Sequence, residues 1–196
     1  FFGDVPLFTE ARLTAGQAGT LTRTPKDEVY AQIELDLQNA IASLPNSQSQ
    51  VGRVNKYTAY ALLGKVLLYQ DKFAEAASAL DNVIGVYSLV SDYGSQFLRF
   101  GENGPESVFE IQYSNQSNWY DWGCAHCSEG NYAIIMNGPR GWSGPEYAQG
   151  WSFNVPTEEF YNSFEEGDSR RDATVLDIEA FAAATGASYT EGYDHT

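Results

Sequence analysis

The sequence predicts a mainly α protein in which helical hairpins are followed by a short β element and long irregular loops. Three patterns indicate this class: apolar residues recur at helical spacing within 24–84, a short alternating segment occupies 106–113, and 114–150 shows no regular period. The chain has 196 residues, of which 43% are hydrophobic, so it can enclose an ordinary core. We expect residues 1–196 to be the internal part of a single domain.

Charge limits the classes of partner. The chain carries 26 acidic and 11 basic residues, a formal net charge of −15, and its basic residues do not cluster beyond the pair Arg170-Arg171. Nucleic acid and anionic lipid would both be repelled, and no stretch reaches the length of a membrane-spanning helix. We therefore expect no nucleic-acid partner and no direct membrane insertion by this segment. The start at Phe1, without an initiator Met or signal core, predicts that the natural N-terminus lies upstream.

The first long helix is expected to begin next to Thr24. Thr24 can cap it, Pro25 suits the first helical position, and acidic residues follow at the positive end of the helix dipole. Pro45 predicts its end. Apolar residues three or four positions apart predict one buried face: Val29, Ile33, Leu37, Ala40, Ile41 and Leu44.

A second helix is expected after the capping residue Asn55 and a third after the break at Asp71-Lys72, so that the two form a hairpin within the tetratricopeptide-like region 24–84. Gly64 and Ala76 are small, and helix axes about 8 Å apart leave no room for larger side chains. We predict that these two residues permit close packing. The spacing resembles a tetratricopeptide repeat. The inward stripes are Tyr60, Leu63, Gly64, Leu67 and Leu68, then Phe73, Ala76, Ala77, Leu80, Val83 and Ile84.

The pattern changes after the helical region. Residues 106–113 alternate as in a half-buried strand, with Phe109, Ile111 and Tyr113 on one face. Residues 114–150 are rich in Gly, Asn, Ser and aromatic residues, and they are too many for an ordinary connection. We expect 114–150 to be an aromatic loop region with a functional role.

A last helix is expected over 157–166, with acidic residues in its first turn. Phe160 and Phe164 have helical spacing, which predicts that both face inward. Asp168 and Arg170 follow this helix, and we expect a local charged hydrogen bond between them to fix the turn.

Five segments of the sequence occur in a characteristic order. They are Phe2 to Leu7, Arg53 to Tyr69, Glu106 to Tyr113, Gly150 to Thr157 and Phe164 to Arg171. Together they resemble the SusD/RagB family of outer-membrane glycan-binding lipoproteins. The resemblance extends over nearly the whole chain, which corresponds to a middle portion of a family member.

The resemblance implies a function. A family member is lipid-anchored at the outer membrane, binds polysaccharide or oligosaccharide at the cell surface, and passes it to a SusC-like TonB-dependent transporter. It performs no chemistry itself. We therefore expect a glycan ligand, a SusC-like partner and no catalytic residues.

Aromatic side chains in or beside the loop region are the candidate site, because a flat ring can stack on the apolar face of a sugar while amides and carboxylates bind its hydroxyls. The expected ligand-binding residues are Trp119, Tyr120, Trp122, Trp142, Asn118 and Asp121. Tyr132 and Tyr147 belong to the same aromatic group. The alternative is that these rings pack the loops onto the helices.

The cluster Cys124-Ala125-His126-Cys127 raises the question of a metal or redox site. Zinc needs four ligands, and His195 is the only other histidine, at the far end of the chain. A redox dithiol should open a helix after a strand, whereas this cluster lies in a Gly-rich stretch. We expect no metal and no cofactor. A local disulfide between Cys124 and Cys127 suits an exported protein, and two free thiols are the alternative.

Two other functions compete with glycan binding. A glycoside hydrolase needs two carboxyl groups across a cleft, whereas the pairs Glu158-Glu159 and Glu165-Glu166 are adjacent and diverge by about 100° on a helix. No nucleophile, phosphate-binding or metalloprotease motif is present. A tetratricopeptide-like protein-interaction scaffold is favoured by the hairpin, but the sequence after Tyr93 is not repetitive.

Overall fold

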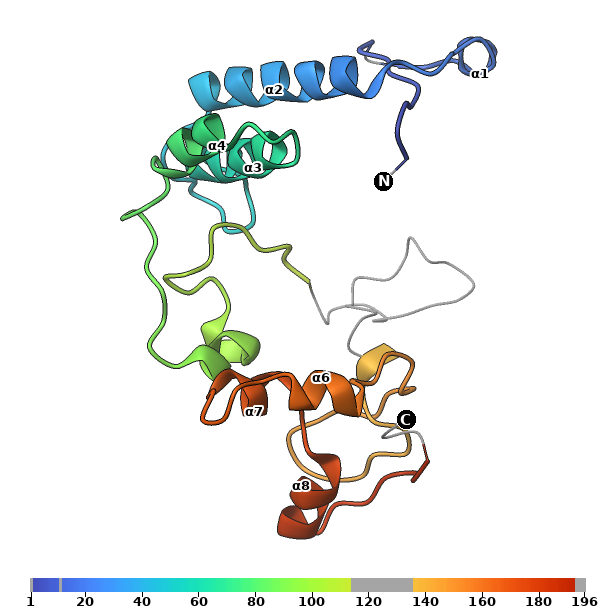
Figure 1. Cartoon of the computed structure of the whole chain (residues 1–196), viewed down its shortest axis with the longest axis vertical. Helices are drawn as coiled ribbons and strands as arrows, with labels where there is room; N and C mark the ends of the chain where they lie inside the picture. Colours follow the sequence, from blue (N-terminus) through green and yellow to red (C-terminus); the bar gives the residue numbers. More distant parts are fainter. Residues whose placement is uncertain (1, 11, 114–135, 193–196) are drawn as a thin grey trace. The chain divides into compact units, whose positions relative to one another are not determined.

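The computed structural model describes residues 2–10, 12–113 and 136–192, and it confirms the mainly α class (Figure 1). The chain divides into two compact units: unit 1 comprises Phe1–Leu89 and Asn103–Glu110, and unit 2 comprises Val90–Glu102 and Ile111–Thr196. The expectation of a single domain stays a prediction. None of the helices in the described ranges is long and apolar enough to cross a bilayer.

The longest helix of unit 1, α2, spans Lys26–Ser43 and is capped from a distant part of the chain. The backbone N–H of Lys26 donates to Oδ1 of Asp4 at 2.9 Å. The prediction that Thr24 caps this helix is wrong, because Pro25 is the N-cap residue and the backbone of Thr24 forms an antiparallel bridge with Val5. The Asp4 carboxylate instead lies at the positive end of the helix dipole. A single turn, α1 (Ala15–Ala18), precedes α2.

The predicted hairpin is formed by α3 (Lys56–Leu68) and α4 (Phe73–Leu80). Asn55 caps α3 as predicted: its Oδ1 accepts the backbone N–H of Thr58 at 2.9 Å, and the Thr58 hydroxyl accepts the N–H of Asn55 at 3.5 Å. Both ends of this capping box are therefore satisfied. The core of unit 1 contains Leu63, Leu67, Ala76 and Ala79, against which Leu37 and Ile41 of α2 pack.

Close packing of the hairpin is confirmed at Gly64. A Cβ atom on Gly64 would lie 2.6 Å from Cγ and Cδ2 of Leu80, so the Leu80 side chain occupies the space of the missing one. Ala76 is buried in the same core. The absence of a side chain at position 64 therefore sets the spacing of α3 and α4.

The buried face is narrower than the apolar pattern predicts. Six of the residues that were expected to face inward are exposed: Ile33, Leu68, Phe73, Ala77, Leu80 and Ile84. Helix α4 ends at Leu80, so Ile84 lies beyond the helix and loses the helical register that placed it inward. Gly85 follows with φ of 83°, a left-handed conformation that turns the chain.

Residues 106–113 do not form the predicted strand. The β structure of the described residues consists of isolated bridges, and none involves this segment. A side chain of α3 binds the backbone of this segment instead: the Thr58 hydroxyl donates to the carbonyl oxygen of Val108 at 3.1 Å. The expected inward face remains exposed at Phe109, Ile111 and Tyr113.

Unit 2 contains short helices connected by long irregular segments. They are the 3₁₀ helices η1 (Tyr93–Phe97) and η2 (Arg99–Gly101) and the α-helices α6 (Glu158–Asn162), α7 (Arg170–Thr174) and α8 (Ile178–Thr185). Neither α7 nor α8 was expected from the sequence pattern. Asp177 caps α8, and Gly186 ends it in the left-handed conformation.

The predicted helix 157–166 is shorter than expected. Thr157 caps α6, but the helix ends at Asn162, where the Ser163 hydroxyl donates to the carbonyl oxygen of Phe160 at 2.7 Å. Such a side-chain bond competes with continuation of the helix. Phe160 is exposed rather than inward, and its ring packs edge-on against Phe164 with centroids 5.4 Å apart.

The expected charged turn after α6 is present. The Nε and Nη2 atoms of Arg170 donate to the two carboxylate oxygens of Asp168 at 2.9 and 2.5 Å, and the backbone N–H of Arg170 donates to the same carboxylate at 2.9 Å. The side-chain hydrogen bond from Arg170 is the main cause that lowers the pKa of Asp168 to about 2, and the backbone bond adds to it. The bonds fix the start of α7.

We predict that Gly64→Ala destabilises the protein. The new methyl group would overlap Leu80, and this overpacking outweighs the gain in helix propensity, for a net loss of about 1 to 2 kcal/mol. Chemical denaturation measures the change. Gly16→Ala is the matched control, since a Cβ there meets nothing within 4 Å. In a Leu80→Ala background the additional cost of Gly64→Ala should disappear; a cost that persists there would contradict the account.

We predict that Asp168 contributes to acid stability. Because its pKa is lower in the folded protein than its ordinary value of 3.8, its contribution is complete above pH 3.8 and is lost as pH falls towards about 2. Thermal melts across this range should show a shallower loss for Asp168→Asn than for the parent. Arg170→Gln should flatten the same part of the profile. Parental profiles in both variants would contradict this assignment.

Candidate functional site

A cavity of about 440 Å³ in unit 2 combines aromatic, amide and hydroxyl groups. This volume lies within the range of small-molecule sites. Its lining comes from three stretches of chain, 137–156, 174–178 and 189–190, and consists of Asn137, Gly138, Pro139, Arg140, Tyr147, Ala148, Ser152, Asn154, Val155, Pro156, Thr174, Leu176, Ile178, Tyr189 and Thr190.

One wall forms where residues 136–140 run beside residues 150–153. Backbone N–H groups of Gly150, Ser152 and Phe153 donate to the carbonyl oxygens of Pro139, Gly138 and Met136 at 2.9, 3.0 and 2.8 Å. A Cβ atom on Gly150 would lie 2.5 Å from Cα of Gly138, so the two backbones touch directly. This contact is possible only because position 150 has no side chain.

Arg140 is held in place within this wall. Its Nη2 and Nε atoms donate to the carbonyl oxygen of Trp151 at 2.7 and 3.2 Å, and its backbone N–H donates to the Ser152 hydroxyl at 2.9 Å. Ser152 has φ of 54°, in the left-handed region that non-glycine residues rarely adopt. Strain of this kind persists where surrounding contacts enforce it, and it is concentrated at functional sites.

The C-terminal part of the lining is attached to the same arginine. The backbones of Ser143 and Ser188 exchange hydrogen bonds at 2.8 and 3.0 Å, and the N–H of Thr190 donates to the carbonyl oxygen of Arg140 at 2.8 Å. Gly141, which lies between Arg140 and Ser143 in the sequence, has φ of 65°. This pairing brings Tyr189 and Thr190 to the cavity although they are about fifty positions from Arg140 in the sequence.

An aromatic cluster supports the remaining side of the cavity. The Trp142 ring is packed at 6.0 Å from Tyr147 and 5.8 Å from Phe181, and the latter two rings are 5.3 Å apart. Trp142 is 5% exposed, whereas Tyr147 is 43% exposed and lines the cavity. The buried indole therefore supports a phenol ring that remains accessible. Within the described residues, Nε1 of Trp142 is a buried donor without a hydrogen-bond partner.

Tyr147 remains a neutral phenol at physiological pH. Burial raises its pKa, and the neighbouring negative charge of Glu146 raises it further. A neutral phenol can both donate and accept a hydrogen bond, and its ring offers an apolar face. With the nearby amides and hydroxyls, this group can stack on a flat ligand and bond to its polar edge.

Most of the predicted site lies outside the described residues. This applies to Asn118, Trp119, Tyr120, Asp121 and Trp122, whose part in ligand binding stays a prediction. Residues 114–135 of the expected aromatic loop region 114–150, and with them Cys124 and Cys127, also lie outside the described residues.

Trp142 is the predicted site residue that the structure places. It lies next to the cavity lining but is packed within the aromatic cluster, and its direct contact with ligand stays a prediction. Sequence reasoning did not select Asn137, Arg140, Asn154 or Tyr189. Each is isolated in the sequence, and only the long-range backbone pairing brings them together.

The described residues do not form an evident metal site. No group of three or more His, Cys, Asp or Glu side chains within 2–10, 12–113 and 136–192 is arranged to hold an ion. The arrangement of the cavity is suited to stacking and hydrogen bonding.

Helical-hairpin packing in unit 1 and a loop-built cavity in unit 2 define a mainly helical class of protein with a potential small-molecule cavity. Comparisons with known proteins agree. The SusD-like family model, described as starch-binding and associating with the outer membrane, matches residues 1–68. SusD-like protein P2 of Formosa agariphila is 32% identical over 185 residues, which cover 91% of this chain and 35% of that protein. The chain is therefore similar to SusD-like proteins over most of its length.

Solved structures show the same relationship. Surface glycan-binding protein A from Bacteroides thetaiotaomicron, in complex with laminarihexaose, matches with a TM-score of 0.83 and 27% identity, covering 100% of this chain and 44% of that one. Surface glycan-binding protein A from Bacteroides uniformis matches with a TM-score of 0.74 and 25% identity, covering 100% and 41%. The chain thus spans about a third of the first curated relative and less than half of these two structures.

We predict that Gly150→Ala disrupts the first wall of the cavity. The added methyl group would meet the Gly138 backbone, which cannot move aside as a side-chain end can, and we expect a loss of about 1 to 3 kcal/mol in stability. Thermal denaturation measures it. Gly94→Ala is the control, because a Cβ there makes ordinary 3.5 Å contacts with Ala173 and Asp92. Equal melting temperatures for the two variants would contradict the proposed contact.

Proposed function

We propose that this protein captures glycan chains at the cell surface, and that the cavity of unit 2 contributes to the binding site. The observation that carries the proposal is the half-exposed Tyr147 ring, supported by buried Trp142 and surrounded by hydrogen-bonding side chains. Similarity to the SusD-like family, which is described as starch-binding, supports carbohydrate as the ligand class.

The cavity offers both parts of carbohydrate recognition. The phenol face of Tyr147 would stack against the C–H face of a sugar ring, while the amides of Asn137 and Asn154 would bond to hydroxyls. Arg140 holds the wall through the Trp151 carbonyl and presents its guanidinium group beside the cavity. Because the site is open and offers few hydrogen-bonding groups, we expect millimolar to micromolar affinity, which corresponds to a binding free energy of about −4 to −8 kcal/mol. Such affinity permits release.

The predicted aromatic residues of the loop region would extend this site. Trp119, Tyr120 and Trp122, with Asn118 and Asp121, belong to the stretch that precedes Asn137 of the cavity lining in the sequence. A polysaccharide presents many equivalent sugar units, so additional rings would bind successive units of one chain.

We further propose the cellular setting that the family resemblance implies. The family is described as associating with the outer membrane. In this proposal the full-length protein is lipid-anchored there, binds glycan without cleaving it, and passes it to a SusC-like TonB-dependent transporter. The weak affinity expected for the cavity suits this transfer.

We predict that replacing cavity side chains weakens glycan binding. The full-length protein would be titrated calorimetrically with laminarihexaose and with maltohexaose, a starch fragment. Asn137→Ala and Asn154→Ala each remove hydrogen bonds and should weaken binding about 5-fold. Tyr147→Ala removes the stacking surface and should weaken it about 10-fold or more. Melting curves must accompany Tyr147→Ala, since its ring also packs against Phe181.

Controls separate the site from general effects. Phe153→Ala removes a ring that is 65% exposed and does not line the cavity, so it should bind as the parent does. Trp119→Ala and Trp122→Ala test the loop region separately. Parental affinity in all of the Asn137, Tyr147 and Asn154 variants would refute the cavity as the site. Release of new reducing ends from either oligosaccharide would refute binding without cleavage.

A further inference from the structure

Unit 1 contains a second hollow, which lies between α2 and the turn that connects α3 to α4. Its volume is about 550 Å³. On the α2 side, most lining residues are three or four positions apart and so share one helix face. On the other side, the lining is formed by the turn residues 69–72. The lining is Lys26, Asp27, Ala31, Glu34, Leu35, Gln38, Tyr69, Gln70, Asp71 and Lys72. We call this hollow the α2–turn cleft.

Side-chain bonds hold the two sides of the cleft together. Glu34 of α2 accepts hydrogen bonds from Nζ of Lys72 at 2.5 Å and from Nε2 of Gln70 at 2.8 Å. Gln70 Nε2 also donates to the carbonyl oxygen of Val66 at 3.1 Å. The hydrogen bond from Lys72 is the main cause that lowers the pKa of Glu34, so this carboxylate remains charged and keeps both partners at neutral pH.

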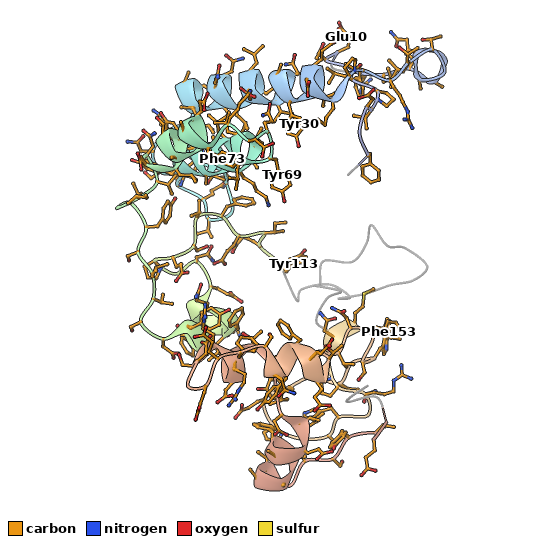
Figure 2. All side chains as sticks on the ribbon, in the orientation of Figure 1. Glu10, Tyr30, Tyr69, Phe73, Tyr113 and Phe153 are labelled. Carbon is orange, nitrogen blue, oxygen red and sulfur yellow. The ribbon has the colours of Figure 1, made fainter. Side chains whose placement is uncertain are left out.

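The turn itself is tightly closed and displays an aromatic ring. Backbone N–H groups of Asp71 and Lys72 donate to the carbonyl oxygens of Leu68 and Leu67, both at 3.1 Å. Asp71 adopts φ of 59°, which reverses the chain. Tyr69 remains 59% exposed at this turn and can be located in Figure 2. A ring on a closed turn loses little conformational freedom when a ligand stacks on it.

The chemistry of the lining selects a class of ligand. The carboxylates of Asp27, Glu34 and Asp71 are not among groups arranged for a metal ion in the described residues. Lys72 is already bonded to Glu34, and the remaining acidic groups outnumber Lys26, so the cleft does not attract an anion. Charged and amide groups form most of the lining, which disfavours an extended apolar ligand.

A neutral ligand with many hydroxyl groups and one apolar face satisfies these conditions. Amides, carboxylates and ammonium groups supply both donors and acceptors for hydroxyls. The Tyr69 ring and the neighbouring Leu35 side chain, both exposed, supply the apolar contact. These are the properties of a saccharide unit.

We propose that the α2–turn cleft is a second saccharide-binding site, distinct from the cavity of unit 2. The choice of saccharide as ligand class rests in part on the proposed function, whereas the residues of the two sites do not overlap. A second weak site on one protein increases its retention on a polysaccharide, because one polymer carries many copies of the recognised unit.

The test uses the full-length protein titrated with maltohexaose and laminarihexaose, followed by two-dimensional NMR or calorimetry. In an Asn154→Ala background, which weakens the cavity of unit 2, residual binding should remain. Tyr69→Ala and Gln38→Ala should each weaken that residual binding, by about 10-fold and about 3-fold, whereas Tyr69→Phe should retain it. Phe73→Ala is the matched control: its ring is 61% exposed, close to the 59% of Tyr69, but it does not line the cleft.

The outcomes separate this proposal from the proposed function. If Tyr69→Ala and Gln38→Ala both leave the residual binding of the Asn154→Ala protein unchanged, the second site is overturned. If Asn154→Ala still weakens binding in that case, the cavity of unit 2 remains supported. Sensitivity to Tyr69 and Gln38 with no effect of Asn154→Ala would support the cleft and refute the cavity. An equal loss in Phe73→Ala and Tyr69→Ala would overturn the cleft, since the effect would then not be specific to its lining. Absence of any binding to both oligosaccharides would overturn both sites for these glucans.

Discussion

Direct contact at positions without a side chain is the constraint on which both units depend. In unit 1, Leu80 occupies the space that a side chain on Gly64 would fill, and this sets how closely α3 and α4 pack. In unit 2, Gly150 lies against the backbone of Gly138, and this aligns the two stretches that form one wall of the cavity. A methyl group at either position would separate the surfaces, so each glycine determines geometry well beyond its own residue.

The two contacts have different consequences for ligand binding. The packing at Gly64 stabilises a regular hairpin whose turn carries Tyr69 beside α2. The contact at Gly150 instead positions irregular backbone, where strained Ser152 and the Trp151 carbonyl hold Arg140. Two aromatic residues of unit 2 also have different roles: Trp142 is buried and supports Tyr147, which remains accessible to a ligand. A rigid support of this kind reduces the conformational freedom that binding would otherwise remove.

Local signals in the sequence predicted the helical region well. Asn55 capped its helix as expected and Pro45 marked the end of the first long helix, because each acts within a few residues. Small Gly64 indicated close packing because α3 and α4 are joined by a short turn and must pack against each other. Long-range contacts were not predictable in the same way. Asp4 replaces Thr24 at the start of α2, and Arg140 meets Thr190 through a backbone hydrogen bond between residues far apart in the sequence. Composition also could not distinguish a buried aromatic such as Trp142 from an exposed one such as Tyr147.

In the proposed function, glycan binding in the unit 2 cavity depends on the Tyr147 ring. A crystal structure of the full-length protein with laminarihexaose or maltohexaose would locate the bound sugar. We expect a sugar ring stacked on Tyr147, with its hydroxyls bonded to Asn137 or Asn154. An oligosaccharide bound elsewhere, with no sugar within contact distance of Tyr147, would contradict this proposal.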